Sequence, residues 1–337
     1  NEQLPIVGAG NQQYYRNKLE FSFTARRWIE RDEMKENELI EETRGLGFNV
    51  PGQYSKVVNI NNCYLQGDPS NAIRNALIEY VIKEDVSCYH LNMKHGMMRN
   101  LIIRNTTIGE LMVIVVFREN DKPVIDKLLS FLNDTFPEIT SLNYMVNGKL
   151  NDTTYDLEVK HFSGEKFIIE ELCGLRFKIS PKSFFQTNSK QAEVLYKKVI
   201  DLARLTGNEI VYDLYTGTGS IALCVAADAK KVVGIEQGAE AIADAWENAK
   251  LNSIESVHFE SGLTRKVLNP SFIEEHGSAD VVITDPPRSG MHPEVVQAIL
   301  DLQPNRIVYV SCNPATQARD IGLMTDQYTV EILSLIH

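Results

Sequence analysis

The sequence lacks any long apolar run. No stretch of about 18 consecutive apolar residues occurs, so no membrane-spanning helix is predicted. Residues 1–30 also lack the charged, apolar and small-residue segments of a secretory signal. The protein is therefore expected to be cytoplasmic and to have no membrane partner.

Cysteine is scarce, and its spacing shows no pairs. The five cysteines are odd in number, far apart and without a Cys-x-x-Cys pair: Cys63, Cys88, Cys173, Cys224 and Cys312. This pattern argues against a disulfide framework and against a zinc site within the chain. We expect free thiols and no bound metal.

Positive charge is in deficit, with 34 Lys and Arg against 45 Asp and Glu and a net charge of −11. A wholly basic surface for nucleic acid is not expected, because phosphate contacts depend on Lys and Arg. Two local basic clusters stand out, one with Lys94, Arg99 and Arg104 and one with Arg16, Lys18, Arg26 and Arg27. Each cluster is either solvated surface charge or a local nucleic-acid contact.

The pattern of predicted elements changes near residue 180. Before it, short β-rich runs alternate with turn signals, and 100–120 is typical of a β-hairpin. Apolar residues at helical spacing predict helices over 71–85 and 121–136. This mixture predicts an α+β region.

After residue 180, apolar strand runs and helical segments alternate, which is typical of βαβ units in a parallel, doubly wound sheet. We expect an α/β protein with an α+β domain over 1–180 and a Rossmann-like domain over 181–337, truncated at its C-terminus. In such sheets ligands bind at the carboxyl ends of the strands. Four residues fall at predicted strand ends: Tyr215, Glu236, Asp285 and Cys312.

A glycine turn follows the first strand of the second region. Gly217 and Gly219 allow a tight turn and a close approach of the backbone to a ligand. Glu236 ends the next strand, 19 residues after Gly217, where a carboxylate can accept hydrogen bonds from both ribose hydroxyls. The combination predicts a cofactor that carries a nucleoside.

Two features favour S-adenosylmethionine over a dinucleotide as this cofactor. Ala222 replaces the third glycine of a Gly-x-Gly-x-x-Gly run, which a pyrophosphate would require. Asp213 opens the motif, where a carboxylate can hold a cationic amino group. NAD is the alternative cofactor.

Two loops at the same predicted sheet edge carry the reactive candidates. Asp285, in DPPRSG, can accept a hydrogen bond from a cofactor or a base edge. Arg288 stands where amino-methylating enzymes carry an aromatic residue, which favours a different acceptor atom. Cys312 leaves the last strand just before Pro314. A free cysteine is usually a small buried hydrophobe, but this position faces the substrate edge, so Cys312 is the candidate nucleophile.

Five motifs occur in order along the second half of the chain: SFFQTN (183–188), DLYTGTG (213–219), VVGIE (232–236), TDPPRSG (284–290) and YVSCNPATQARD (309–320). Together they resemble the RNA 5-methyluridine methyltransferase family, most closely its bacterial 23S rRNA uracil-5 branch. The first half resembles the family more loosely, through 14–23 and 47–52. The resemblance implies a class I S-adenosylmethionine-dependent methyltransferase fold, preceded by an RNA-binding domain.

The resemblance also implies a mechanism. Carbon 5 of uracil is a poor nucleophile, so the Cys312 thiolate adds to carbon 6, and the resulting enolate takes the methyl group. A base then removes the proton at carbon 5, and the cysteine is expelled. The target uridine must first be flipped out of its helix or loop.

The motifs imply roles for individual residues. Those expected at the cofactor are Gln186, Tyr215, Gly217, Gly219, Ser220, Glu236 and Asp285. Asp285 is also a candidate base, and Arg288 a candidate substrate contact. Phe184 is expected to stack on the target base, although both Phe184 and Phe185 have core packing as the alternative.

The chain departs from the family pattern at three places. The family's general-base glutamate lies further beyond the cysteine than His337, so this polypeptide is expected to form the uracil adduct and release it slowly. Leu263 replaces an Asp or Asn that in relatives is expected to hold the adenine amino group. Cys63 resembles the last ligand of an iron–sulfur site, but no other cluster cysteine precedes it, so a cluster is not expected.

Several functions are compatible with these motifs. The first is methylation of carbon 5 of a uridine in RNA, with 23S rRNA as the substrate and a monomer as the enzyme. The second is the same reaction on tRNA. A non-catalytic RNA-binding protein is an alternative of another class, although such a protein needs no nucleophile. A small-molecule methyltransferase is disfavoured by the β-rich first half and its basic clusters.

Overall fold

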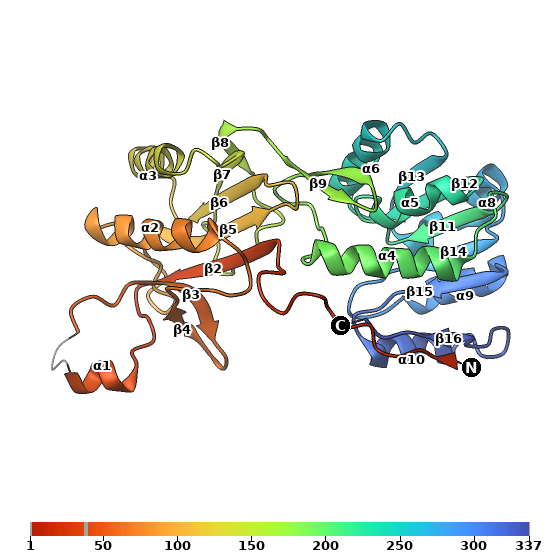
Figure 1. Cartoon of the computed structure of the whole chain (residues 1–337), viewed down its shortest axis with the longest axis horizontal. Helices are drawn as coiled ribbons and strands as arrows, with labels where there is room; N and C mark the ends of the chain where they lie inside the picture. Colours follow the sequence, from red (N-terminus) through yellow and green to blue (C-terminus); the bar gives the residue numbers. More distant parts are fainter. Residues whose placement is uncertain (1, 37–39, 337) are drawn as a thin grey trace.

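Two large β-sheets, each with its own helices, make up the protein. The computed structural model describes residues 2–36 and 40–336. Figure 1 shows the sheets side by side along the longest axis, the earlier one on the left and the later one on the right. The α+β start and the strand–helix alternation that follows it are both confirmed.

The first large sheet has seven strands in the order β4-β3-β2-β5-β6-β7-β8. They are β2 (Lys18–Thr24), β3 (Gly45–Val50), β4 (Gln53–Asn59), β5 (Met98–Asn105), β6 (Leu111–Phe117), β7 (Ser141–Val146) and β8 (Lys160–Gly164). β5 and β6 form the predicted antiparallel hairpin. β6 and β7 run parallel, because the helix α3 (Lys122–Thr135) crosses over between them.

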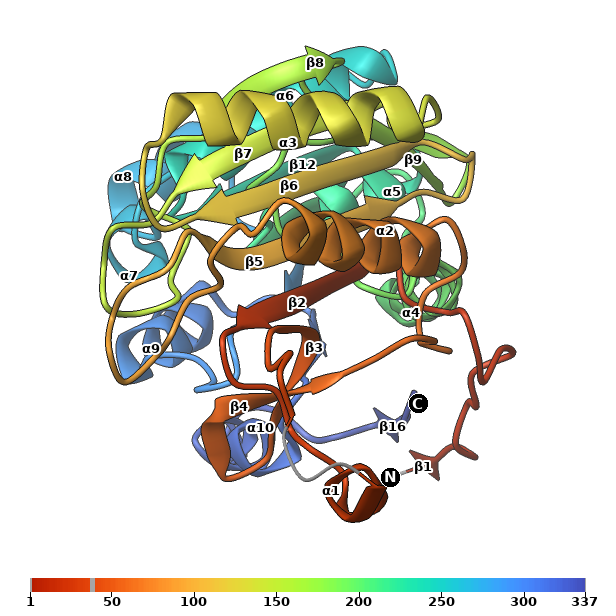
Figure 2. The ribbon, with the colours of Figure 1, turned by 90° about the vertical axis from the view of Figure 1, so that its left-hand side faces the viewer.

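Two predicted helices, α2 (Ser70–Lys83) and α3, lie across one face of this sheet (Figure 2). Strand residues such as Phe21 and Leu101 are buried beneath them. Successive strand residues point to opposite faces, so Ile102 and Ile114 are buried on the other face. There they share a core with residues of the second half of the chain, so the two sheets are joined through apolar contact.

A hairpin of β9 (Ile168–Leu172) and β10 (Leu175–Ile179) follows the first sheet. It packs against the helices α4 (Ser189–Ala203) and α6 (Ala239–Leu251) of the second sheet, and Phe177 is fully buried in the shared core. The domain boundary at residue 180 stays a prediction, but the hairpin just before that boundary packs with the second sheet.

The second large sheet has five strands, all parallel, in the order β13-β12-β11-β14-β15. They are β11 (Ile210–Leu214), β12 (Lys231–Glu236), β13 (Val257–Ser261), β14 (Val281–Thr284) and β15 (Arg306–Tyr309). The chain builds outward from β11 to one side and then to the other. The crevice at the carboxyl ends of β11 and β14 is therefore the switch point at which such sheets bind ligands.

Short helices connect these strands and cover both faces. They are α4 (Ser189–Ala203), α5 (Ser220–Val225) with the 3-10 turn η1 (Ala226–Asp228), α6 (Ala239–Leu251), α7 (Thr264–Val267), α8 (Pro270–His276), α9 (Pro293–Leu302) and α10 (Pro314–Gly322). None of the helices in the part of the chain described is long and apolar enough to cross a membrane.

The two ends of the described chain lie together (Figure 1). β1 (Glu2–Gln3) pairs in parallel with β16 (Ile332–Leu333), within the apolar C-terminal run. The remaining helix, α1 (Arg31–Glu36), stands apart from the first sheet at the lower left of Figure 1.

Candidate active site

The predicted strand-end residues meet at one edge of the second sheet. Leu214 and Thr284 are register partners on neighbouring strands, so Tyr215 and Asp285 leave the sheet side by side. The backbone N–H of Asp285 donates to the carbonyl of Leu214 across 3.3 Å. β15 lies next to β14, which brings the loop that carries Cys312 beside the loop that carries Asp285.

The glycine turn has the left-handed backbone that glycine permits, as a tight turn requires. Gly217 and Gly219 have φ angles of 57° and 79°, in the left-handed region. A Cβ on Gly219 would lie 2.9 Å from the ring of Phe259, so only glycine fits there. A Cβ on Gly217 would meet no atom within 4 Å. The turn is thus packed behind Gly219 and open at Gly217, where a ligand can approach the backbone.

Asp213, just before this turn, carries an unsatisfied oxygen. Its Oδ2 accepts hydrogen bonds from Thr216 Oγ1 at 2.5 Å and from the N–H of Ala222 at 3.1 Å. Its Oδ1 is buried and has no partner among the described residues. Burial raises the pKa of Asp213 to about 7. A ligand with a cationic amino group could donate the missing hydrogen bond to Oδ1. The sequence predicts such a group at Asp213.

Asp285 and Glu236 complete an acidic edge around the turn. Burial raises the pKa of Asp285 to about 6. Glu236 Oε1 accepts from the N–H of Gly238 at 2.8 Å, and its Oε2 accepts from the N–H of Gly217 at 3.3 Å. These bonds orient the Glu236 carboxylate at the end of β12, beside the open turn. The position fits the predicted contact with ribose hydroxyls.

Ser220 has a hydroxyl partner that the sequence did not single out. Its Oγ lies 2.9 Å from the hydroxyl of Tyr196, which α4 brings from the other side of the turn. Tyr196 is buried, and burial raises its pKa. Its position in an amphipathic helix indicates only that Tyr196 faces the core, so spacing could not predict its contact with Ser220.

The SFFQTN loop is held by residues of the first sheet. Asn17 Nδ2 donates to the carbonyl of Gln186 at 2.8 Å, across 169 positions of sequence. Arg104, which is buried, donates to the carbonyl of Ser183 at 2.7 Å. The first half of the chain therefore positions this loop, a role that neither residue's local sequence predicts.

The two phenylalanines of the SFFQTN loop lie in different environments. Phe185 is buried with its ring centroid 5.9 Å from that of Phe177, which is core packing. Phe184 is 72% exposed. The alternative of core packing is thus wrong for Phe184 and correct for Phe185. Stacking of Phe184 on a base stays a prediction.

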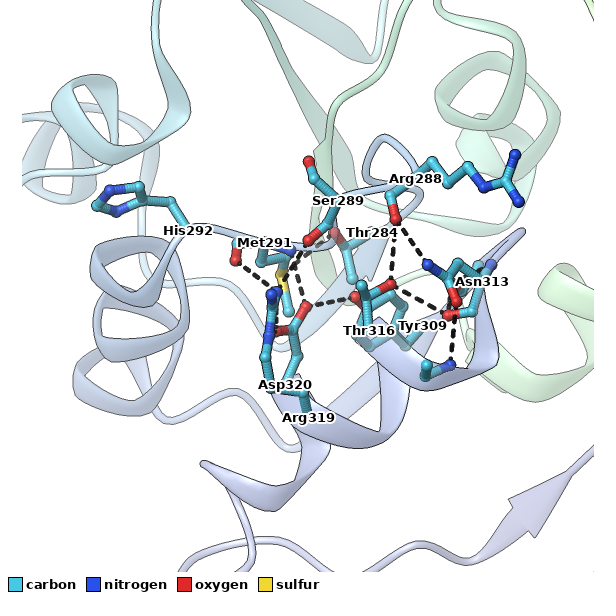
Figure 3. A network of polar contacts seen from close by, with 12 residues as sticks. Thr284, Arg288, Ser289, Met291, His292, Tyr309, Asn313, Thr316, Arg319 and Asp320 are labelled. Carbon is cyan, nitrogen blue, oxygen red and sulfur yellow. Dashed lines mark hydrogen bonds and ion pairs between the residues drawn. The ribbon is translucent and has the colours of Figure 1, made fainter.

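Cys312 is exposed, and its corner is fixed by polar contacts (Figure 3). Asn313 begins α10, since its Oδ1 accepts from the N–H of Ala315 at 3.1 Å. Asn313 Nδ2 and Thr316 Oγ1 both donate to the carbonyl of Arg288. The backbone of Arg288 is tied down, while its side chain extends away from this network in Figure 3.

Asp320 binds the two loops together and was not singled out from sequence. It is fully buried, and its Oδ2 accepts from the N–H of Met291 and from Tyr309 Oη, both at 2.7 Å. Arg319 donates to Asp320 and to the carbonyls of Ser289 and Met291 (Figure 3). The only sequence signal for Asp320 was its place at the end of the motif YVSCNPATQARD (309–320).

Cys63 is packed in the core of the first sheet. Its N–H donates to Asn71 Oδ1 at 2.8 Å. No group of three or more metal-ligating side chains occurs within residues 2–36 and 40–336.

The family match and the similar proteins agree with one another, since all are described as RNA methyltransferases. Residues 105–337 match the tRNA (uracil-5-)-methyltransferase family. An uncharacterized RNA methyltransferase of Bacteroides thetaiotaomicron is 50% identical over 333 residues, which are 98% of this chain and 73% of that protein. A relative of the same description from Porphyromonas gingivalis is 50% identical over 328 residues, which are 96% of this chain and 70% of that protein.

One solved structure is similar along the whole chain. It is the tRNA (uracil-54, C5)-methyltransferase of Pyrococcus abyssi in complex with S-adenosyl-L-homocysteine. The TM-score is 0.79 at 29% identity, and the match covers 99% of this chain and 74% of that one. This agreement confirms the Rossmann-like class I fold predicted for the second half of the chain.

Proposed function

We propose, since the chain belongs to the tRNA (uracil-5-)-methyltransferase family, that it transfers a methyl group from S-adenosylmethionine to carbon 5 of a uridine in RNA. The observation that carries the proposal is an exposed cysteine, Cys312, at the carboxyl edge of a parallel sheet and next to Asn313, which is hydrogen-bonded to the Arg288 loop. Ribosomal RNA is the proposed substrate, and tRNA is the alternative, which the name of the Pyrococcus relative favours.

The residues at the sheet edge fit the proposed cofactor. Asp213 Oδ1 is placed for a cationic amino group, and Glu236 for ribose hydroxyls. Asp285 lies beside Tyr215, close to the open turn at Gly217. When bound there, S-adenosylmethionine supplies an electrophilic methyl group.

Cys312 supplies the nucleophile for the uracil ring. Its sulfur forms a bond to carbon 6, and the electron pair of the 5,6 double bond moves through carbon 4 to oxygen 4. The enolate returns this pair to carbon 5, which would bond to the methyl carbon as the bond between that carbon and the sulfonium sulfur breaks and S-adenosylhomocysteine leaves. A base then takes the proton from carbon 5, the double bond forms again, and the bond between sulfur and carbon 6 breaks.

Two roles remain proposed for Asp285. With a pKa of about 6, its carboxylate is ionised at neutral pH, as either a base or a cofactor contact requires. In an Asp285→Asn variant, loss of the base leaves a methylated RNA–protein adduct that denaturing gels detect. Loss of a cofactor contact instead weakens S-adenosylmethionine binding in calorimetry.

The test of the function is direct. The protein is incubated with methyl-labelled S-adenosylmethionine and, separately, with unmodified rRNA and tRNA, and 5-methyluridine is mapped by nuclease digestion and mass spectrometry. Label at carbon 5 of a uridine in rRNA is the expected result. Label only in tRNA supports the alternative substrate, and label in neither RNA contradicts the function.

A further inference from the structure

The two basic clusters of the sequence have different roles in the structure. Arg99 is buried, donates to the carbonyls of Asn147 and Lys149, and pairs with Asp152. Arg104 holds the SFFQTN loop, and Arg27 pairs with Glu33. These arginines maintain the fold and are not available to a ligand.

One remaining cation of these clusters, Arg26, lines a hollow on the first sheet. Lys56 of β4 and His90 line the same hollow. Arg26 is exposed, and no side-chain contact of its guanidinium is seen within the described residues. The residues that line the hollow are Thr24, Arg26, Lys56, His90, Leu91 and Asn92, and none of them is acidic. In a chain of net charge −11, such a hollow is a local site for an anion.

The hydrogen-bonding capacity of the hollow is suited to phosphate. His90 Nδ1 accepts from the N–H of Met93 at 3.2 Å, so in the neutral ring the proton is on Nε2, which can donate. Lys56 Nζ lies 5.1 Å from the ring centroid of Trp28, an exposed aromatic beside the hollow. Arginine, lysine and an imidazole N–H are all donors to phosphate oxygens.

An adjoining hollow shares Thr24 and Leu91 with this one and contains buried polar atoms without partners. Tyr89 Oη and Asn100 Oδ1 are such atoms, and both residues are less than a tenth exposed. The acid of this second hollow, Asp152, is already paired with Arg99. A ligand that reaches past the cationic hollow therefore meets unsatisfied hydrogen-bonding groups.

The hollow is on the side of the first sheet that faces the second sheet. Phe21 and Phe23 point into the core under α2 and α3, so Thr24 points to the opposite face. Ile102 of that opposite face packs with residues of the second half of the chain. A polynucleotide held at Cys312 can thus extend along this face.

We propose that Arg26, Lys56 and His90 bind a backbone phosphate of the RNA substrate, away from the target uridine. The proposal rests on RNA being the substrate. Because a phosphate contact carries no sequence information, this site sets affinity and orientation of the RNA and leaves the chemistry at Cys312 unchanged.

The test measures the salt dependence of RNA binding. Fluorescein-labelled RNA with a uridine-containing loop is titrated with protein at 50 to 200 mM KCl, and anisotropy gives the affinity. Arg26→Gln/Lys56→Gln is expected to weaken binding about tenfold at 100 mM and to reduce the slope of log K against log[salt] by about 0.7 for each phosphate that the variant no longer neutralises. Lys56→Arg keeps the charge and is expected to bind RNA more tightly than Lys56→Gln does.

A matched control separates the site from general charge. Lys230→Gln/Lys250→Gln removes the same charge from two exposed positions in the second half of the chain, just before β12 and in α6, and is expected to change the slope little. Equal losses in the two double variants, or an unchanged slope in the hollow variant, would overturn the proposal. In a Trp246→Phe background, Trp28 is the only tryptophan, and its emission is expected to change on RNA binding.

The outcome is independent of the test of function. A wild-type protein that methylates RNA while the hollow variant keeps its full salt slope overturns the phosphate site alone. The reverse result is that the wild-type protein transfers no methyl group to any RNA, while Arg26→Gln/Lys56→Gln still reduces the salt slope of RNA binding. This result overturns the proposed reaction and supports the phosphate site.

Discussion

Tyr309 Oη donates a 2.7 Å hydrogen bond to Oδ2 of Asp320, a carboxylate with no exposed surface. The same oxygen accepts from the N–H of Met291, so it joins β15, α10 and the loop after β14. Cys312 lies in the turn between Tyr309 and Asp320. The geometry of the nucleophile therefore depends on a buried acid that does not contact the reacting atoms.

Asp320→Asn is expected to lower both stability and kcat. The amide cannot accept all of the bonds that the carboxylate accepts, and an unsatisfied buried donor costs about 1–3 kcal/mol. Thermal unfolding and steady-state methyl transfer measure the two effects. Asp326→Asn, an exposed acid four residues after α10, is the control and is expected to change neither. A fully active Asp320→Asn would contradict the positioning role.

Phe184 and Phe185 are expected to respond oppositely to alanine. Phe185→Ala opens a cavity in the core beside Phe177 and is expected to cost about 3–5 kcal/mol in denaturant unfolding. Phe184→Ala removes an exposed ring and is expected to leave the unfolding midpoint unchanged while KM for RNA rises several-fold. Unchanged RNA kinetics in Phe184→Ala would remove its stacking role.

Cofactor affinity is expected to rise with pH through the pKa of Asp213. Burial raises that pKa to about 7, so the folded protein without ligand holds a proton there at pH 6 that a cationic ligand must displace. Calorimetry with S-adenosylmethionine from pH 5.5 to 7.5 is expected to show tighter binding at each step. Asp213→Asn should bind weakly with little pH dependence. A wild-type affinity that does not change with pH would argue against an ionised Asp213 in the complex.

The raised pKa of Asp213 also determines how the stability of the protein without ligand depends on pH. Because the folded state binds this proton more tightly than the unfolded state, its contribution destabilises the fold as pH rises from about 4 to about 7. Asp213→Asn removes this dependence. Chemical unfolding at pH 5 and 7 is expected to show a smaller decrease in stability for the variant than for the wild type.

Cys312→Ala is expected to abolish methyl transfer while it retains S-adenosylmethionine binding. The exposed thiol supports no core packing, so thermal stability should not change. Cys173→Ala, a half-buried cysteine in the β9–β10 turn, is the matched control and should stay active. Residual 5-methyluridine formation by Cys312→Ala would exclude the adduct mechanism.

Local sequence was sufficient to predict the elements and the edge at which the site lies. β12 (Lys231–Glu236) ends at Glu236 as predicted, because an apolar, β-branched run ends at a charged residue before a new helical period. α3 was predicted because its apolar residues recur at helical spacing. The structure adds that Asp121 caps this helix and that Pro123 is in its first turn. Alternation of strands and helices then requires a parallel sheet, whose carboxyl edge gathers Asp213, Glu236, Asp285 and Cys312.

Only the tertiary structure decided which of these residues is supported, and by what. Asn17 reaches Gln186, Arg104 reaches Ser183, and Tyr196 reaches Ser220. The first two contacts join residues that are far apart in sequence, and all three depend on how separate elements pack. Periodicity and motif spacing describe only neighbours along the chain, so they contain no term for such contacts. For the same reason, the sequence could not distinguish the buried Phe185 from the exposed Phe184, nor the structural Arg99 from the open Arg26.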